Sequence, residues 1–289
     1  MKTHVKKRKT SHANRIVFAI VFILFVLYAA YILYPFVFAF NASLKENGRA
    51  FLANTVSPAF PMYFSNYAKA FKELSIENNS FFEMIFNSLW YAGGTTFLSM
   101  MSSTFAAYIL CKYKFRGNKF IYSLVLIVMM LPTYGALPSR YRLLSQLGWI
   151  NSPLYIISAA GGFDFAFLVV YSFFKGVSWS YAEAAFIDGA GHLKVFVRIM
   201  LPMALPAITA ITITTFIGAW NAYEGPLLYL PKLPTLAAGL FAYNEKMAFF
   251  ANQPVYFAGV VLSLIPIIGI FIAFQNTIMT KVYAGGLKS

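Results

Sequence analysis

The chain has 289 residues, of which 60% are hydrophobic, 19% are aromatic and only 11% are charged. Soluble globular proteins carry about 25% charged residues, so this composition is typical of a membrane protein and excludes an ordinary soluble enzyme. The net charge of +14 comes from short basic clusters beside apolar runs. That distribution argues against a nucleic-acid-binding face, which would need the charges along one side of a soluble domain.

The apolar segments predict an all-α, polytopic membrane fold with six transmembrane helices. A bilayer core of about 30 Å requires roughly 20 apolar residues in a helix. Residues 1–15 form a basic tail, residues 16–40 the first span, and residues 41–84 a loop too short for a separate domain. Residues 280–289 form a second tail. The core, residues 85–279, holds the other five spans, at 85–110, 120–137, 154–174, 207–223 and 255–279.

The basic residues predict the orientation of these spans. The N-terminal tail and the sequence CKYKFRGNK, residues 111–119, are the strongest basic clusters, and six spans place both on one side. Because short basic loops stay in the cytoplasm, both termini are expected there and loop 41–84 is expected outside. The second span is rich in small and hydroxyl residues, which allow helices to pack closely in lipid. Pro132 and Pro266 are interpreted as kinks in the third and sixth spans.

A polar segment, SYAEAAFIDGAGHLKVFVRIMLPMALP, separates the fourth span from the fifth. Ser180 and Glu183 have the spacing of a capping box, which predicts a short helix over residues 181–187. Asp188 and Gly189 supply its end, since glycine accepts the left-handed conformation that often follows a helix. This short helix would lie in the cytoplasm between spans four and five.

A second helix is expected over residues 192–200, before Pro202 constrains the turn into the fifth span. The physical pattern leaves two interpretations of this polar unit. It is either a hairpin that caps the bundle or a surface on which another protein docks.

The spacing of the polar segment resembles the cytoplasmic loop signature of bacterial ABC importer permeases. The matching residues are Glu183-Ala184-Ala185, Gly189, Ile199 and Leu201-Pro202. The stretches NSLWYAGGTT, AAYILCKYKFRGNKF, LPTYGALPSRYRLLSQLGWINSP and FIGAWNAYEGPLLYL resemble the carbohydrate-uptake branch, in particular the smaller permease of maltose-type importers. The similarity covers most of the chain from about Tyr67. The sequence VSWSYAE lacks the family's usual proline and leucine, and YAGGLKS only loosely resembles its glycine-rich C-terminus.

The resemblance implies a non-catalytic subunit of the bacterial cytoplasmic membrane that imports sugars or oligosaccharides. Its partners would be a second homologous permease, two cytoplasmic ATPase subunits and an extracytoplasmic solute-binding protein. This chain would bind no cofactor, and ATP and Mg²⁺ would be held by the ATPases. The short helix would then be a cytoplasmic coupling helix between spans four and five. Closure of the ATPases on ATP would pull it and switch the bundle from inward- to outward-facing. By motif position, the ATPase-docking residues would be Glu183, Ala184, Ala185, Asp188 and Gly189.

Candidates for the substrate path are Trp220, Asn221, Tyr223 and Glu224, because sugar sites combine aromatic faces with a few hydrogen-bonding groups. The two aromatic residues equally fit an aromatic belt at the membrane surface. Asp164 is a further carboxylate at the edge of a span, where charges are costly. For Asp164 and Glu224, interfacial anchoring or a structural hydrogen bond is favoured over contact with substrate.

Three other functions compete with a sugar importer. A secondary transporter would need paired charges near the bilayer midplane, and none is evident. A membrane enzyme would need a constellation of His, Asp or Glu, whereas the chain has three histidines, two of them in the N-terminal tail, and one cysteine. No G-x-x-x-x-G-K-[ST] sequence for binding ATP occurs. The same permease architecture for another solute stays open, because the loop signature is shared among importer classes.

Overall fold

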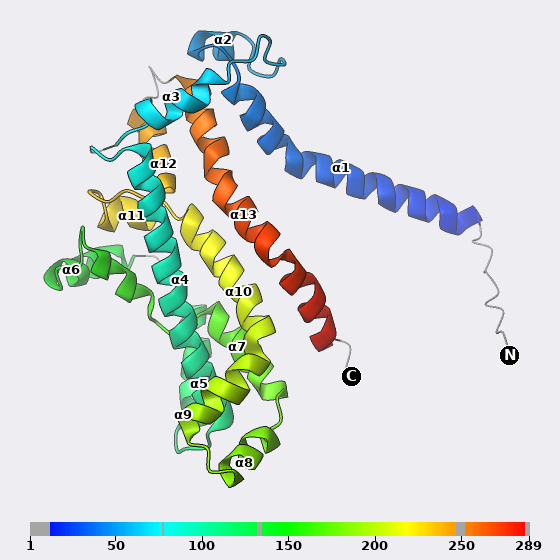
Figure 1. Cartoon of the computed structure of the whole chain (residues 1–289), viewed down its shortest axis with the longest axis vertical. Helices are drawn as coiled ribbons and strands as arrows, with labels where there is room; N and C mark the ends of the chain where they lie inside the picture. The colour runs from blue at the N-terminus through cyan, green and yellow to red at the C-terminus, as the bar shows by residue number, and fades with distance from the viewer. Residues whose placement is uncertain (1–11, 77, 132–134, 247–251, 287–289) are drawn as a thin grey trace.

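The computed structural model describes residues 12–76, 78–131, 135–246 and 252–286. This part of the chain is almost entirely helical and contains no β-strand, only an isolated bridge between Ile76 and Asn79. The all-α prediction is therefore confirmed for the described residues. Figure 1 shows an elongated bundle, with α2 and α3 at one end and α8 and α9 at the other.

The helices alternate between long rods and short connecting pieces. In chain order they are α1 (His12–Ser43), α2 (Gly48–Ala53), α3 (Ser65–Glu73), α4 (Phe81–Lys112), α5 (Asn118–Met130), α6 (Leu137–Gln146), the 3₁₀ helix η1 (Pro153–Ala159), α7 (Phe165–Gly176), α8 (Ser180–Ile187), α9 (His192–Val195), the π-helical turn η2 (Phe196–Met200), α10 (Leu201–Asn221), α11 (Glu224–Tyr229), α12 (Leu236–Lys246) and α13 (Gln253–Gly286).

Three of the described helices are long and apolar enough to cross a membrane, namely Asn14–Ser43, His192–Asn221 and Gln253–Gln275. Two shorter apolar helices, α5 and α7, accompany them. The 32-residue α4 is also long enough, but its glycines and hydroxyl residues make it less apolar. A membrane protein is thus supported, and the count of six crossings stays a prediction.

The predicted third and fourth spans do not form single helices. α5 ends at Met130, short of the predicted end at Leu137, and Pro132 lies outside the described residues. The range 154–174 is divided, because η1 ends before a glycine pair and α7 begins only after it. In that break Gly162 has a φ of +70°, a left-handed conformation that favours glycine and is incompatible with a continuous α-helix.

The expected turn at Pro202 is wrong, because one helix runs without interruption from His192 to Asn221. Proline has no N–H to offer to the carbonyl four residues earlier. The turn before it is widened instead, and the N–H of Leu201 donates to the carbonyl of Phe196, five residues earlier. A π-helical turn therefore accommodates the proline inside a continuous rod. Pro266 likewise lies within α13.

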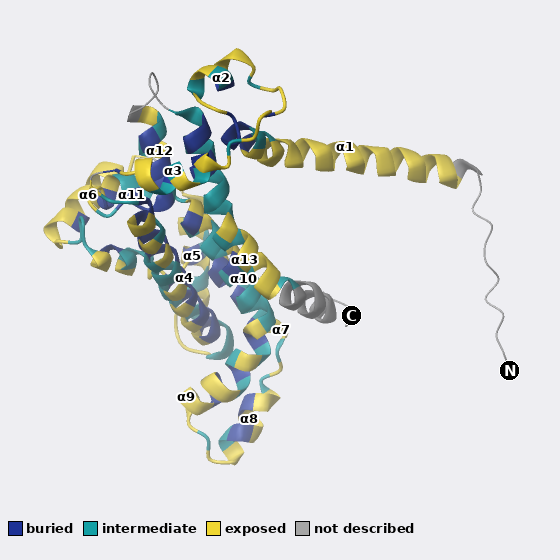
Figure 2. Ribbon diagram, turned by 45° about the horizontal axis from the view of Figure 1, so that its top comes forward, coloured by how far each residue is buried: buried dark blue, intermediate teal, exposed yellow. Residues whose placement is uncertain are grey.

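The core follows α4, which packs against both α7 and α10. One buried cluster, including Phe167, Phe174 and Met200, fills the bundle toward α8. A second, including Phe81 and Trp220, fills the end near α3 and α12. Figure 2 shows that α1 is exposed along nearly its whole length, and every residue from 14 to 37 is exposed. A helix this apolar requires lipid or another protein around it.

Candidate functional site

The polar unit at one end of the bundle is built on α8, whose start differs from the prediction. The N-cap residue is Trp179, whose side chain makes no capping hydrogen bond, and the Ser178 hydroxyl accepts a hydrogen bond from the Ser180 N–H at 3.3 Å. Ser180 lies inside the helix, with its hydroxyl 2.8 Å from that of Ser178. The expected capping box between Ser180 and Glu183 is therefore wrong, although the helix itself forms almost over the predicted residues.

The predicted end of α8 at Gly189 is confirmed and has a specific geometry. Gly189 adopts a φ of +79°, and its N–H donates to the carbonyl of Phe186 at 3.0 Å. The N–H of Ala190 donates to the carbonyl of Ala185 at 2.9 Å. These two bonds are the Schellman motif. A Cβ at position 189 would meet nothing within 4 Å, so conformation rather than space requires glycine.

The two faces of α8 differ in exposure. Ala182 is 0% exposed and, with Ala185, packs into the core cluster beneath the helix. The outward face is formed by Glu183, Ala184, Ile187, Asp188 and Gly189, all exposed, with Ile187 86% exposed. Four of the five predicted docking residues thus lie outward on one short unit, whereas Ala185 seats the helix on its own chain.

Aromatic contacts join this unit to the end of α4. The Trp179 ring lies 5.6 Å from that of Tyr113 and 6.0 Å from that of Phe186. The Tyr113 hydroxyl is 2.8 Å from Nδ1 of His192, the first residue of the rod that becomes α10. The amino group of Lys112 donates to the carbonyl of Val177, just before α8. Movement of α8 is therefore resisted by both α4 and α10.

A hollow that we call the polar chamber lies about midway along α4 and has a volume of about 410 Å³. Side chains from α4, α6, η1 and α10 meet there. Hydroxyl groups line it from Tyr91, Thr95, Ser99, Tyr155, Ser158 and Thr215, and its charged groups are Arg140 and Asp164. The chamber therefore offers many hydrogen-bonding groups inside an otherwise apolar bundle.

Asp164 holds the wall of the chamber together. Its Oδ1 accepts hydrogen bonds from the Ser103 hydroxyl at 2.8 Å and from the Phe167 N–H at 3.0 Å. Its Oδ2 accepts from the Ser99 hydroxyl at 2.8 Å. The carboxylate is thus the N-cap of α7 and ties that helix to α4. This arrangement agrees with the favoured interpretation of Asp164 as a structural hydrogen-bonding residue.

Stacked tyrosines form another wall. The rings of Tyr91 and Tyr155 are nearly parallel at 6.2 Å, and Tyr155 stacks on Tyr229 at 5.1 Å. The Arg140 guanidinium lies 5.6 Å from the centre of the Tyr229 ring and donates to the Ser158 hydroxyl at 3.4 Å. Aromatic faces next to hydroxyl and guanidinium donors suit a polyhydroxylated ligand.

The four predicted substrate-path residues do not line this chamber. Trp220 is 2% exposed, and its indole N–H donates to the carbonyl of Ser263 in α13 at 3.2 Å. Asn221, Tyr223 and Glu224 lie at the end of α10 and the start of α11, and both Asn221 and Glu224 are exposed. The Tyr223 ring stacks on a phenylalanine of α12. The sequence did contain a signal for the chamber, namely the hydroxyl-rich second span.

Residues 99–282 match the family described as the binding-protein-dependent transport system inner membrane component. The chain belongs to this family. The matched part of this inner membrane component contains α8, the rod from α9 to α10, and most of α13. The family match therefore includes the exposed polar unit on α8.

Named relatives and a solved structure agree with this assignment. This chain is 28% identical over 285 residues to the diacetylchitobiose uptake system permease protein NgcG of Streptomyces coelicolor, and the alignment covers 97% of this chain and 92% of the relative. It is 31% identical over 214 residues to the maltodextrin transport system permease protein MdxG of Bacillus subtilis, covering 70% and 74%. The fold matches a chain in the crystal structure of a bacterial ABC transporter involved in alginate import. That match has a TM-score of 0.77 at 23% identity and covers 93% of this chain and 99% of that one.

Proposed function

We propose that this protein is the permease subunit of an ATP-driven, binding-protein-dependent importer of sugars or oligosaccharides, forming half of the translocation path. The observation that carries the proposal is α8. It is a short helix ended by a Schellman motif, with an exposed outer face and a buried alanine face. The names of the relatives, which refer to diacetylchitobiose and maltodextrin, support the sugar class.

In the proposed topology α1, α4, α5, α7, α10 and α13 cross the membrane, the short α5 and α7 together with their adjoining segments. Both termini and α8 lie in the cytoplasm, and α2 and α3 lie outside. The basic sequence over residues 111–119, which begins in the last turn of α4, supports this orientation because such loops stay inside. The α2–α3 end would then meet the solute-binding protein.

The remaining partners follow from the exposed surfaces. A second, homologous permease would cover part of α1, whose residues 14–37 are all exposed, and lipid would cover the rest. Two cytoplasmic ATPases would receive the α8 units of the two permeases and would hold ATP and Mg²⁺. This chain would have no catalytic role and would couple their closure to the movement of its own helices.

Within the chain, Glu183, Ala184, Asp188 and Gly189 form the proposed docking surface, and Ala185 holds α8 against the core. The polar chamber is the proposed sugar-facing part of the path, because it combines stacked tyrosines with hydroxyl donors. Asn221, Tyr223 and Glu224 would lie at the edge of the path rather than inside the chamber. Trp220 would secure α10 to α13.

Disulfide cross-linking in the complete importer tests the docking surface. In a Cys111→Ser background, Ala184→Cys should cross-link to single cysteines around the candidate groove of the ATPase, with a yield that changes with ATP and vanadate. Ala182→Cys is the matched control, since Ala182 is two residues away on the same helix and is 0% exposed. Equal yields from both positions would contradict the assigned faces.

Uptake of a labelled oligosaccharide by the reconstituted complex tests the solute class. Transport should require ATP and the solute-binding protein. Transport of an amino acid in place of any sugar would contradict the assignment of sugars as the solute class. Solute movement by this chain alone under an ion gradient would refute the importer as a whole.

A further inference from the structure

An apolar groove lies beside the polar unit, where the end of α4 meets the start of the α9–α10 rod. Its volume is about 520 Å³. Its apolar lining comes from Phe105, Ile109, Phe115, Leu193 and Phe196. Leu193 is 69% exposed and Ile109 is 46% exposed, so the hydrocarbon surface is open to a ligand. The groove is separate from both the outer face of α8 and the polar chamber.

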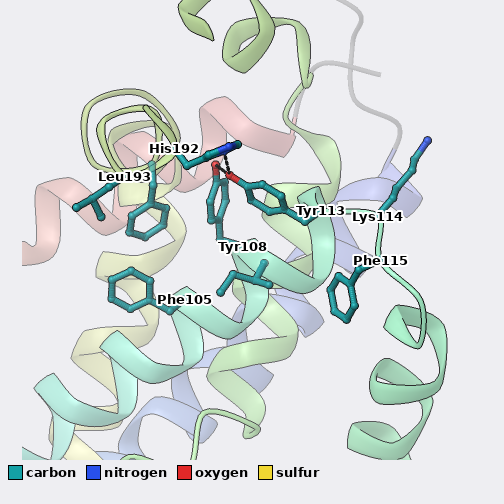
Figure 3. A pocket seen from close by; sticks show the side chains of 9 residues that line it. Phe105, Tyr108, Tyr113, Lys114, Phe115, His192 and Leu193 are labelled. Atoms are coloured by element: carbon teal, nitrogen blue, oxygen red, sulfur yellow. Dashed lines mark hydrogen bonds between the residues drawn. The ribbon is translucent and has the colours of Figure 1, made fainter. Parts of the chain in front are cut away.

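Hydrogen-bonded rings hold the walls of the groove in place, as Figure 3 shows. The Tyr113 hydroxyl is 2.8 Å from Nδ1 of His192 and 3.5 Å from the Tyr108 hydroxyl. The rings of Phe105 and Phe196 lie 4.8 Å apart, across the two helices. Because these contacts join α4 to the α9–α10 rod, the groove is preformed, and a ligand would not have to create it.

Positive charge lies at the groove and in the hollow beside it. Lys114 lines it, and in Figure 3 this side chain extends from the edge of the aromatic cluster. A second hollow shares His192 and Leu193 with the groove and is lined by Lys194 and Arg198. All three cations are exposed, and no acidic side chain is among the described residues that line either hollow. An anionic ligand is therefore favoured.

The groove also has the character of a membrane boundary. It spans the last turns of the long α4 and the first turns of a rod apolar enough to cross a membrane. Tyrosine rings are common at that depth, and lysine side chains there extend toward the aqueous phase. Basic pockets between transmembrane helices bind the head groups of anionic lipids.

We infer that this groove binds an anionic phospholipid. One acyl chain lies along Phe105, Ile109 and Phe196, the phosphate of the head group pairs with Lys114, and Lys194 and Arg198 in the adjoining hollow add attraction for its negative charge. A free phosphate would leave the apolar surface uncovered, and a neutral lipid would leave the three cations without a partner. The bound lipid would brace the junction of α4 with the α9–α10 rod. This inference requires a membrane-embedded chain but not a particular transported solute.

Photolabelling of the complete importer in nanodiscs tests the inference. The probe is a phosphatidylglycerol with a diazirine on its acyl chain, and labelled peptides are mapped by mass spectrometry. Label is expected at the end of α4 and around Leu193. Unlabelled phosphatidylglycerol should compete with it, whereas unlabelled phosphatidylcholine should not.

Charge-matched variants locate the head group. Removing a cation near the membrane surface weakens binding of an anionic lipid about fivefold. Lys114→Gln with Lys194→Gln should therefore raise the phosphatidylglycerol concentration needed for competition by roughly 25-fold. The control is Arg116→Gln with Lys119→Gln, which removes the same charge from residues near Lys114 that do not line the groove.

Three results would each overturn the inference. The first is equal competition by both lipids, since the groove would then only touch bulk lipid. The second is equal loss of affinity in the two double variants, since general surface charge would then explain binding. The third is protein–protein cross-linking from Leu193→Cys with no lipid label, since a partner subunit would then fill the groove. Failure of the sugar-uptake or ATPase cross-linking assays would leave these outcomes unchanged.

Discussion

Replacing Gly189 by alanine isolates the contribution of one backbone conformation to energy coupling. Gly189 has a φ of +79° and ends α8 through two backbone hydrogen bonds. An added Cβ would meet nothing within 4 Å. Steric collision within this chain is therefore excluded, so an effect of Gly189→Ala comes either from the conformational preference of alanine or from contact with the docked ATPase. Only contact with the ATPase would make the larger Gly189→Asn worse than Gly189→Ala.

The expected cost follows from that preference. An L-residue in the left-handed helical conformation costs roughly 1–2 kcal/mol relative to glycine. At room temperature this lowers the ratio of the native end of α8 to its alternative conformations by about 5- to 30-fold. Molecules with an alternative end of α8 would lack the hydrogen bond from the Ala190 N–H to the Ala185 carbonyl, and the outer face of α8 would lose its orientation in them. Gly189→Asn should be milder, since asparagine tolerates this conformation better.

The assay is the ratio of sugar transported to ATP hydrolysed by the reconstituted importer. Gly189→Ala should lower this ratio several-fold while hydrolysis continues, because the ATPases would close without moving the bundle. Gly191→Ala is the matched control. Gly191 lies in the same loop, has an ordinary φ of −76°, and also has open space where a Cβ would lie.

Equal ratios in the two variants would refute the reasoning, since the left-handed conformation would then be irrelevant to coupling. A parallel fall in transport and hydrolysis would also count against it, because that pattern indicates loss of assembly. A substitution of Gly189 by a bulkier residue should be at least as severe as alanine.

Three further predictions concern stability. Asp164→Ala should destabilise the protein by about 1–3 kcal/mol, since it removes the N-cap of α7 and two bonds to α4, and an unchanged thermal midpoint would contradict this. Gly259→Ala should lower the free energy of unfolding by about 1–3 kcal/mol, because the added Cβ would collide with a methyl group of Leu74. Gly269→Ala in the same helix has open space for a Cβ and should leave the thermal midpoint nearly unchanged. Glu83 precedes the predicted span 85–110. Hydrogen bonds from the Ser80 N–H and hydroxyl hold the pKa of Glu83 below its usual value. Stabilisation of the protein by this cap should therefore be complete above about pH 4.3 and lost as the pH falls. Thermal midpoints measured from about pH 5 down to about pH 2.5 should therefore fall less steeply in Glu83→Gln, and identical slopes would argue against the cap.

The sequence was most informative where local geometry decides the structure. A glycine after an alanine-rich helix correctly located the end of α8. The capping-box pattern was less reliable, because it depends on the residue before it. At Ser80 the backbone is extended and the box with Glu83 forms. At Ser180 the preceding Trp179 is already helical, with φ −70° and ψ −20°, so the serine lies too far inside the helix to cap it.

The polar chamber could not be located from the sequence because it is a tertiary feature. Tyr91, Arg140 and Tyr155 come from α4, α6 and η1, and no spacing rule relates them. Hydropathy also hides the break between η1 and α7, because two glycines within an apolar run barely change the average. Trp220 fits a sugar site by residue type alone, and only its bond to Ser263 shows that it faces α13.

The proposed docking surface and the polar chamber are connected by two long helices, the rod from α9 to α10 and α4. The rod from His192 to Asn221 has 30 residues and thus a length of about 45 Å. Its first residue contacts the ring cluster beside α8, and Thr215 near its other end lines the chamber. α4 runs between the same two places. Because both helices are anchored at the docking end, a displacement of α8 by a docked ATPase would reach the chamber without a continuous chain of side-chain rearrangements. The π-helical turn before Pro202 is where the rod is most easily bent, so it is the point at which that displacement would be absorbed or transmitted.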